Sequence, residues 1–393
     1  MTNQSELLAR YTNVMMNAFG TPKRAFSRGE GVHLYDADGN SYVDLLAGIA
    51  VNALGHNHPR VSEAICSQVH TLGHVSNFFA TETQVSLAER LAAAAHDDGD
   101  AKVFLVNSGS EANETAFKIS RLTGRTKVVA MEGSFHGRTM GSLALTHTSK
   151  YREPFEPLPG EVVWVPYGDV AALEAAVDEQ TAAVVLETIQ GEAGVLPAPD
   201  GYLEAARRIT SEHGALLWID EVQTGVGRAG HLLAHRAHGI TADLITVAKG
   251  LGNGFPIGAC IAVGEAGKLL TPGLHGNTFG GNPVGCAAAN AVLDELEAGV
   301  LANANKAGAW FAGAVEGLSH PLIAGVRGAG LLWGIVLNEP IGPAFVDAAL
   351  HAGWVCNAPR PDVIRIAPPL IITKDVLGEF VKVLPELLEQ ASD

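Results

Sequence analysis

Three groups of residues along the chain have types and spacings that could do chemistry together. Lys249 ends a short apolar run and precedes a glycine-rich loop in ITVAKGLGNGFPIG, residues 245–258. An ammonium group that loses its water there has a lowered pKa, and the neutral amine can form a Schiff base with a carbonyl compound. A lone lysine at a strand end is more often exposed, with its stem on apolar surface. Its role therefore depends on the other two groups.

The second group follows another apolar run. Ser108, Gly109 and Ser110 in VNSGSEANETAFKI, residues 106–119, lie between a predicted strand and the acidic start of a predicted helix. Backbone N–H groups and hydroxyls at a helix N-terminus suit a phosphate. The same residues are also ordinary N-cap chemistry, and taken alone they favour the cap.

The third group is Asp220 and Glu221 in LLWIDEVQTGVGR, residues 216–228. A carboxylate at the end of a buried strand is unfavourable unless a cation or several donors meet it, and a protonated pyridine nitrogen is such a cation. An acid that caps the next loop is the alternative. The segment between Asp220 and Lys249 is long enough for a crossover helix and a return strand, which would open both side chains onto one crevice.

Strands must position these residues, and the sequence supplies short β-branched runs that are mostly apolar on both faces. They are KVFLV at 102, KVVAM at 127, EVVWV at 161, AVVLE at 183, ALLWI at 215, DLITV at 243 and ACIAV at 259. Helical patterns such as SLAERLAAAA and YLEAARRITSEHG alternate with them. This alternation predicts an α/β fold with a mainly parallel, helix-covered sheet, whose ligands bind at the carboxyl ends of the strands.

The two ends of the chain differ from this middle part. Residues 1–55 contain a predicted hairpin around an Asp-Gly turn, at about 32–46. Residues 281–393 begin with an alanine-rich helix and continue as mixed helix and strand to a final helix from Lys374. We predict that residues 56–280 form the large domain and that both ends build a smaller α+β domain.

Composition limits the class of protein. The 393 residues are 47% hydrophobic and 17% charged, which favours large apolar cores over disorder. The net charge of -16 disfavours nucleic acid and anionic membrane surfaces as partners. The apolar runs are shorter than the ~18 residues of a membrane span. No signal peptide is evident at the N-terminus, and four scattered cysteines are typical of a reducing compartment, so we expect a cytoplasmic protein.

A phosphate cradle, a strand-end acid and a lysine, in this order along a parallel sheet, match the needs of pyridoxal phosphate. With these motifs the chain resembles the class III aminotransferases, which are fold-type I pyridoxal-phosphate enzymes. The resemblance covers nearly the whole chain, through LLAGIAVNALGHNHP, NSGSEANE, SFHGRTMGSLALT, LETIQGEAGV, IDEVQTGVGR, AKGLGNGFPIGA, HGNTFGGNP and VIRIAPPL. It implies a transferase that uses pyridoxal phosphate.

The resemblance implies a role at the cofactor for each motif residue. Lys249 would hold pyridoxal phosphate as a Schiff base and then carry the proton between substrate and cofactor, while Asp220 would keep the pyridine nitrogen protonated. Phe135 and Val222 would enclose the ring, although core packing is the simpler account of these two taken alone. Gln223 would approach the phenolic oxygen. The implied phosphate contacts are Ser108, Gly109, Ser110 and, across the interface of a homodimer, Thr278 from the partner subunit.

The resemblance also implies which residues bind the substrates. Arg138 of FHGRT would bind the α-carboxylate of an ornithine-type substrate, and Arg365 of VIRIAPP that of glutamate or 2-oxoglutarate. A planar guanidinium suits this bidentate recognition of carboxylate. Glu192 of QGEAG would pair with Arg365 while the ω-amine substrate reacts, and would release it for glutamate. As alternatives, Arg138 could pair with a surface acid and Glu192 could be a solvated loop residue.

The implied reaction is N-acetylornithine plus 2-oxoglutarate to N-acetylglutamate 5-semialdehyde plus glutamate, in arginine biosynthesis. Family members that use free ornithine place tyrosines where this chain has Gly48 and Ala80, and the smaller residues leave space for an N-acyl group. Succinylornithine, succinyldiaminopimelate, ornithine and 4-aminobutyrate remain alternative substrates. The competing functions are an aminomutase of the same fold, which usually reads DEVMTG where this chain has DEVQTG, and a catalytically silent protein that binds pyridoxal phosphate.

Three positions depart from the family pattern. Ser110 stands where alanine is common, Thr188 where proline is common, and Asn277 where a hydroxyl residue is frequent. None of these departures removes a catalytic group. The paired histidines His56 and His58 in GHNHP have no further ligand cluster beside them in the sequence, so no metal site is predicted.

Overall fold

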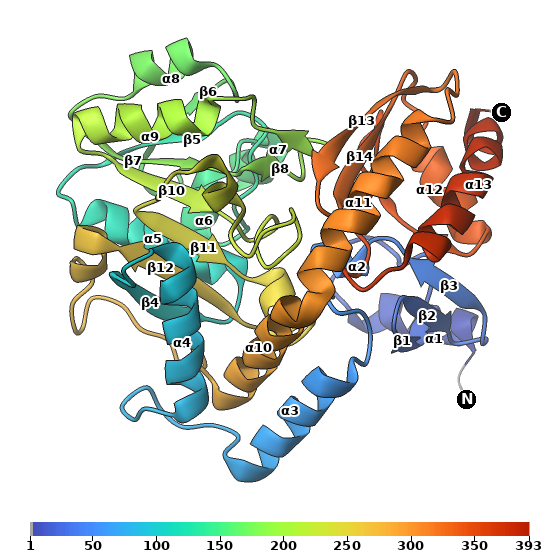
Figure 1. Cartoon of the computed structure of the whole chain (residues 1–393), viewed down its shortest axis with the longest axis horizontal. Helices are drawn as coiled ribbons and strands as arrows, with labels where there is room; N and C mark the ends of the chain where they lie inside the picture. Colours follow the sequence, from blue (N-terminus) through green and yellow to red (C-terminus); the bar gives the residue numbers. More distant parts are fainter. Residues whose placement is uncertain (1–2, 393) are drawn as a thin grey trace.

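The structure, a computed structural model, describes residues 3–392 and divides into a larger and a smaller unit (Figure 1). The larger unit is built on a seven-stranded sheet with the order β4-β12-β11-β10-β7-β5-β6. Its strands are β4 (Ala101–Val106), β5 (Lys127–Met131), β6 (Glu161–Val165), β7 (Thr181–Leu186), β10 (Leu216–Asp220), β11 (Leu244–Val247) and β12 (Gly258–Val263). Only β12 runs antiparallel to its neighbours. The strands match the apolar runs of the sequence, and the predicted mainly parallel sheet is confirmed.

Helices cover both faces of this sheet, which explains why most residues of its strands are apolar. The other elements of the larger unit are α3 (Pro59–Thr71), α4 (Glu82–Ala95), α5 (Gly109–Arg121), α6 (Met140–Leu145), α7 (Ser149–Arg152), η1 (Glu153–Phe155), α8 (Val170–Ala176), β8 (Ile189–Gln190), β9 (Leu196–Pro197), α9 (Tyr202–His213), η2 (Ala234–His238), η3 (Lys249–Gly252) and η4 (Gly264–Lys268). Trp218 of β10 shares one apolar cluster with Phe117 of α5. Leu217 and Ile219, on either side of it, belong to a second cluster with Leu203 of α9.

The helices α4 and α9 lie where the sequence predicted them. Helix α9 is followed by Gly214 with φ 61°, a left-handed conformation that favours glycine. The connection from β10 to β11 contains only the short 3-10 helix η2. The segment is long enough for a crossover helix, but the structure forms no α-helix between β10 and β11. Gly225, Gly227 and Gly230 interrupt this connection, and glycine disfavours a continuous helix.

The smaller unit combines both ends of the chain in two four-stranded sheets. In spatial order these are β1 (Phe26–Glu30), β2 (His33–Asp36), β3 (Ser41–Asp44) and β15 (Trp354–Val355), and then β13 (Ile323–Ala329), β14 (Leu332–Leu337), β17 (Val363–Ile366) and β16 (Asn357–Arg360). Strands β2 and β3 are antiparallel, which confirms the predicted hairpin. Strand β15 pairs in parallel with β3 and aligns Trp354 with Val43. The boundaries at 1–55, 56–280 and 281–393 stay a prediction.

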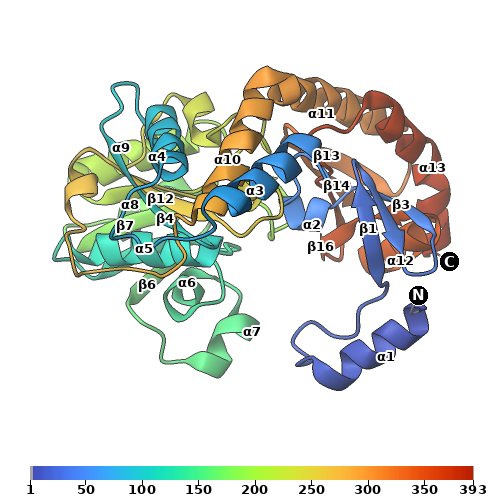
Figure 2. The same cartoon turned by 90° about the horizontal axis from the view of Figure 1, so that it is seen from below.

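A nearly continuous run of helix connects the two units. The remaining elements are α1 (Gln4–Val14), α2 (Ala47–Ala50), α10 (Pro283–Glu295), η5 (Leu296–Val300), α11 (Leu301–Glu316), α12 (Gly342–His351) and α13 (Lys374–Ser392). Figure 1 shows α10 and α11 running from the larger unit to the smaller one, and Figure 2 shows α1 standing apart from the rest of the smaller unit. Helix α1 buries none of its residues. Within residues 3–392, no helix is both long and apolar enough to cross a bilayer.

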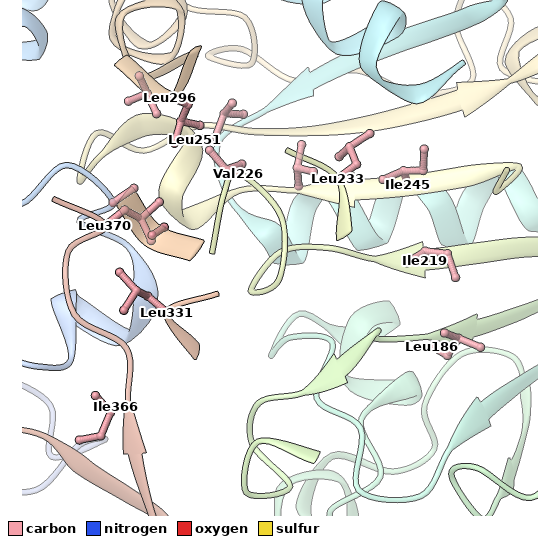
Figure 3. Close-up of a cluster of buried hydrophobic side chains, with 14 of the residues drawn as sticks. Leu186, Ile219, Val226, Leu233, Ile245, Leu251, Leu296, Leu331, Ile366 and Leu370 are labelled. Atoms are coloured by element: carbon pink, nitrogen blue, oxygen red, sulfur yellow. The ribbon is translucent and has the colours of Figure 1, made fainter. Parts of the chain in front are cut away.

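One hydrophobic cluster extends from the large sheet into the smaller unit (Figure 3). Leu186, Ile219 and Ile245 belong to β7, β10 and β11, whereas Leu331 and Ile366 belong to the smaller unit, and all five are fully buried. Burial of such a side chain contributes roughly 1.5–3 kcal/mol. The buried core is therefore continuous between the large sheet and the smaller unit.

Candidate active site

The carboxyl ends of the parallel strands open onto a cavity of about 370 Å³. Asp220 ends β10 and Lys249 follows β11, so both strand ends reach the same space. The other predicted residues that line the cavity are Ser108, Gly109, Ser110, Phe135, Val222 and Gln223. The structure therefore brings together the lysine, the acid and the helix start that the sequence singled out.

Lys249 reaches this cavity from a strained backbone position. Its φ of 44° lies in the left-handed region, which is uncommon for a residue with a side chain and which clusters at functional sites. Burial lowers the pKa of the Lys249 ammonium, although the negative charge of Glu192 opposes this shift. A lowered pKa favours the neutral amine, which is the nucleophilic form.

The start of α5 serves as both an N-cap and an open cradle. Ser108 is the N-cap, and its hydroxyl accepts a hydrogen bond from the Glu111 backbone N–H at 3.2 Å. A Cβ at Gly109 would lie 2.6 Å from Val222 Cγ1, so only glycine fits between helix and loop. The Ser110 hydroxyl accepts from the Arg138 backbone N–H at 3.3 Å. The free N–H groups of the first helical turn thus face a space suited to an anion.

Asp220 is held by donors that the sequence analysis missed. Its Oδ2 accepts from Asn113 Nδ2 at 2.8 Å and from His136 Nδ1 at 2.7 Å, and its Oδ1 accepts from the Val222 N–H at 2.9 Å. Burial disfavours a charged imidazole, but the hydrogen bond and charge of Asp220 outweigh it and raise the pKa of His136. Asn113 lies in NSGSEANE and His136 lies in SFHGRT, two of the motifs that carry the family resemblance. Membership in these motifs was the one sequence signal that could have indicated a role for either residue.

The neighbouring acid, Glu221, points away from the cavity. It accepts hydrogen bonds from the backbone N–H groups of Ala234 and His235 at 2.6 and 2.8 Å, and from His235 Nδ1 at 2.6 Å. The carboxylate is fully buried and holds the start of η2. The alternative of an acid that caps the next loop therefore applies to Glu221, whereas Asp220 faces the cavity.

Glu187 is a further acid in the cavity that the sequence analysis did not assign. It follows β7, lines the cavity and accepts from the Phe135 backbone N–H at 3.3 Å. Burial raises the pKa of Glu187 to about 7. Its carboxyl group can therefore take up or release a proton near neutral pH, close to Lys249. The sequence signal was the acid that ends the run AVVLE.

Arg365 and Glu192 form an ion pair beside the cavity. Arg365 is only 1% exposed, and its Nη1 lies 2.5 Å from Glu192 Oε1 and 3.2 Å from Gln223 Oε1. Its Nε donates to Asn357 Oδ1 at 3.1 Å. Burial alone would raise the pKa of Glu192, but the guanidinium outweighs it and lowers that pKa. Glu192 is thus a partner of Arg365 and not a freely solvated loop residue.

The last two predicted residues lie outside the cavity lining. The Arg138 guanidinium stacks 3.5 Å from the ring centroid of Tyr151 and 5.4 Å from that of Phe135, and no acid within residues 3–392 pairs with it. Thr278 is exposed on the loop after η4. Asn277 fixes this loop, because its Nδ2 donates to the Leu105 carbonyl at 3.1 Å.

The paired histidines have structural partners. His56 Nε2 lies 2.8 Å from Asp44 Oδ2, and His58 Nε2 lies 4.0 Å from Glu295 Oε2. In the part of the chain that the structure describes, no three His, Cys, Asp or Glu side chains are grouped so as to hold a metal ion.

Comparison with known families gives the same picture. The model of the family "Aminotransferase class-III" matches residues 15–388. The chain belongs to this family. Class III aminotransferases are enzymes that depend on pyridoxal phosphate, so the predicted fold type I, enzyme class and cofactor are confirmed.

Curated relatives of this class III aminotransferase are similar over almost the full length. It is 58% identical to the acetylornithine aminotransferase of Mycolicibacterium smegmatis over 388 residues, which cover 98% of this chain and 99% of the relative. It is 55% identical to the acetylornithine aminotransferase of Streptomyces coelicolor, with 100% of this chain and 98% of the relative covered.

Solved structures agree in fold. The N-acetylornithine aminotransferase from Stenotrophomonas maltophilia superposes with a TM-score of 0.82 at 33% identity, covering 97% of this chain and 98% of that one. The ornithine aminotransferase from Toxoplasma gondii ME49 gives a TM-score of 0.94 at 30% identity, covering 100% and 96%. Both likenesses cover the two units together, so the small unit is part of the shared fold.

The residues of this class III aminotransferase fit pyridoxal phosphate. The helix start at Gly109 suits the phosphate, since a glycine there leaves the N–H groups accessible. The buried carboxylate of Asp220 suits a protonated ring nitrogen, and the Lys249 amine with its lowered pKa suits the aldehyde. Phe135 and Val222 line the same cavity and have apolar surface for the ring.

Proposed function

We propose that the chain transfers the terminal amino group of N-acetylornithine to 2-oxoglutarate, giving N-acetylglutamate 5-semialdehyde and glutamate, as in arginine biosynthesis. The observation that carries this proposal is the ion pair between Arg365 and Glu192 beside the Lys249 cavity. The two substrates differ in charge, so the site requires a cation, such as Arg365, that binds a carboxylate of 2-oxoglutarate but is not needed by the reacting end of N-acetylornithine. An aminomutase has no second substrate and needs no such arrangement. Relatives named acetylornithine aminotransferase support the choice of donor.

The residues of the cavity would each have a different role toward the cofactor. When bound, pyridoxal phosphate withdraws electrons from the substrate carbon that carries the amino group. Lys249 would hold the cofactor and, as a free amine, would move the proton at that carbon. Asp220, fixed by Asn113 and His136, would keep the ring nitrogen protonated. Phe135 would lie against the ring and exclude water from one face.

Glu192 would decide which substrate meets Arg365. While it pairs with the guanidinium, the Arg365 charge is neutralised and an ω-amine substrate can occupy the space without a carboxylate there. When glutamate or 2-oxoglutarate binds, its carboxylate would replace that of Glu192 on Arg365. Arg138, at the edge of the cavity beside Tyr151, would bind the α-carboxylate of the ornithine-type substrate.

The space for an acyl group would lie near Gly48. This residue has φ 66°, a conformation that favours glycine, and it lies three positions before Val51 of the cavity lining. A tyrosine at that place, as in relatives that use free ornithine, would fill space with a phenol. Gly48 supports an N-acylated substrate over a free diamine.

We also propose a homodimer in which Thr278 completes the phosphate site of the partner subunit. Exposed aromatic side chains flank this residue, since Phe78 is 91% and Phe279 60% exposed. Asn77 Nδ2 donates to the Gly280 carbonyl at 2.9 Å, so the segments that carry them lie side by side. A patch of this kind is typical of a protein interface. A cytoplasmic location is supported by four cysteines that form no disulfide.

A panel of amine donors tests the proposed substrate. We expect the enzyme with its cofactor, mixed in the absence of acceptor with each donor, to react fastest with N-acetylornithine. Succinylornithine, succinyldiaminopimelate, ornithine and 4-aminobutyrate serve as the comparison set, and the change in cofactor absorbance gives each rate. A faster reaction with any of the four would replace the proposed donor. Turnover that needs no oxoacid acceptor would favour the aminomutase.

The Arg365→Ala variant tests the division between the two substrates. We expect the KM for 2-oxoglutarate to rise roughly 100-fold, since a bidentate pair to a buried carboxylate is lost, whereas the KM for N-acetylornithine changes little. Steady-state kinetics with each substrate varied in turn measure both values. Arg360→Ala is the matched control, because Arg360 lies on the neighbouring strand β16 and is exposed. Equal increases for both substrates would refute the role of Arg365.

A further inference from the structure

A row of three residues crosses the second sheet of the smaller unit. Arg327 of β13 is aligned with Gly334 of β14, and Gly334 is aligned with Arg365 of β17. Residues directly opposite each other in a sheet share one face, and neighbouring strands are ~4.8 Å apart. Two arginines therefore point to the same side, roughly 10 Å apart, with a glycine between them.

The turn that carries Glu192 sits on this row. It joins β8 to β9, and Arg327 Nε and Nη2 both donate to the Gly194 carbonyl, at 3.1 and 2.8 Å. On the other side of the row, Arg365 holds the Glu192 carboxylate. Arg327 thus binds the backbone of the turn, and Arg365 binds the Glu192 side chain.

Gly334 provides the seat for this turn. A Cβ at Gly334 would lie 3.0 Å from Val195 Cβ and 3.1 Å from the Gly194 carbonyl oxygen, so a side chain would press the turn away from the sheet. Val195 itself has φ 52°, a conformation that a β-branched residue rarely adopts. A turn in that conformation persists only where its surroundings determine it, and Arg327 and Gly334 supply those contacts.

We propose that Arg327 is a positioning residue. It fixes the turn that carries Glu192 while the Glu192 carboxylate and the substrate carboxylate replace each other on Arg365, and Gly334 leaves the space in which this turn packs against the sheet. The guanidinium fork fixes the carbonyl two residues from Glu192. The backbone of the turn therefore stays in place while the Glu192 side chain alone leaves and returns. This inference rests on the proposed function, because it assumes that Glu192 alternates with the substrate carboxylate.

Two separate half-reactions test this role, one with N-acetylornithine and no acceptor and the other with glutamate. We expect Arg327→Ala to lower the ratio of the rate with N-acetylornithine to the rate with glutamate about tenfold. A change of this size corresponds to the loss of one hydrogen bond from a charged group. The reaction with N-acetylornithine needs Glu192 on Arg365, whereas that with glutamate does not. Gly334→Ala should shift the ratio in the same direction. Arg327→Lys should give an intermediate ratio, since lysine cannot form the fork.

Arg360→Ala is the matched control for the loss of a positive charge. Arg360 Cγ lies 3.3 Å from where a Gly194 Cβ would be, so it touches the same turn. No hydrogen bond joins its side chain to the turn within residues 3–392. We expect its ratio to stay within twofold of the unchanged enzyme. Hydrogen exchange of the amides at 191–195 should be faster in Arg327→Ala and unchanged in Arg360→Ala.

The outcomes separate this inference from the proposed function. Glu192→Gln should lower the same ratio, and adding Arg327→Ala to it should lower it little further, because both act on one contact. If Glu192→Gln changes the ratio and neither Arg327→Ala nor Gly334→Ala does, the positioning role is wrong. If Glu192→Gln leaves the ratio unchanged, the alternation and this inference are overturned together. Equal loss in both half-reactions would mean that Arg327 is merely structural.

Discussion

The Lys249→Ala variant loses transamination: we expect kcat to fall by at least ~10³-fold, because covalent attachment and proton transfer depend on the same amine. Among residues 3–392, Lys249 is the one lysine that lines the cavity, so no other lysine of the lining can take over. Sodium borohydride should fix pyridoxal phosphate to the unchanged enzyme and not to the variant, as mass spectrometry of the protein would show.

The fold should survive this change. Lys249 makes no hydrogen bond that holds other elements within residues 3–392, and alanine removes a side chain that faces a cavity. Lys268→Ala is the control, since that lysine is exposed and pairs with Glu265 at 2.5 Å. Circular dichroism and the thermal midpoint should be close to those of the unchanged enzyme for both variants. Substantial turnover by Lys249→Ala would remove the basis of the proposed function.

The Asp220→Asn variant should lower kcat by roughly 10²–10³-fold, the usual cost of losing one preorganised charge in an active site. Asparagine keeps the size of the side chain but removes the negative charge that would stabilise a protonated ring nitrogen. It also removes the charge that raises the pKa of His136. The pKa of His136, followed by nuclear magnetic resonance, should therefore fall together with kcat.

Glu221→Gln is the matched control for Asp220→Asn, because the two acids are adjacent and both buried. Glu221 accepts from two backbone N–H groups and faces His235, away from the cavity. We expect its loss to reduce the free energy of unfolding by about 1–3 kcal/mol, measured by denaturant titration, with kcat nearly unchanged. A variant at Asp220 that keeps kcat within twofold would contradict the assigned role.

Local sequence patterns were sufficient to predict the strands of the large sheet and the residues that follow them at the edge of the cavity. The strands of the large sheet are short runs that are mostly apolar on both faces, since helices cover both faces. A polar residue directly after such a run then lies at the edge where parallel strands end. That rule located Ser108, Asp220 and Lys249 together, and the cavity contains all three. The same rule did not separate Asp220 from Glu221. It locates the end of the strand but not the side to which each side chain points, and neighbouring residues point to opposite sides.

Contacts between distant segments were decided by the tertiary structure. His136 acquires a raised pKa only because the loop after β5 meets the end of β10, and no pattern in SFHGRT states that contact. The connection after β10 is long enough for a crossover helix, yet glycines and the buried Glu221 shape it into a loop. Propensity is a weak guide wherever a buried charge requires backbone partners.

The sequence by itself determined the order of the strands in the large domain, the lysine, acid and helix start at the cavity edge, and the family, because these depend on local periodicity and on short motifs. The tertiary structure alone decided that β3 pairs with β15, that Glu192 meets Arg365, and that Arg327 and Gly334 carry the turn between them. The physical reason is register. Which residues face each other across strands is set by the packing of the whole sheet, and a shift of one position would turn Arg327 and Arg365 to the opposite face, away from the turn that carries Glu192.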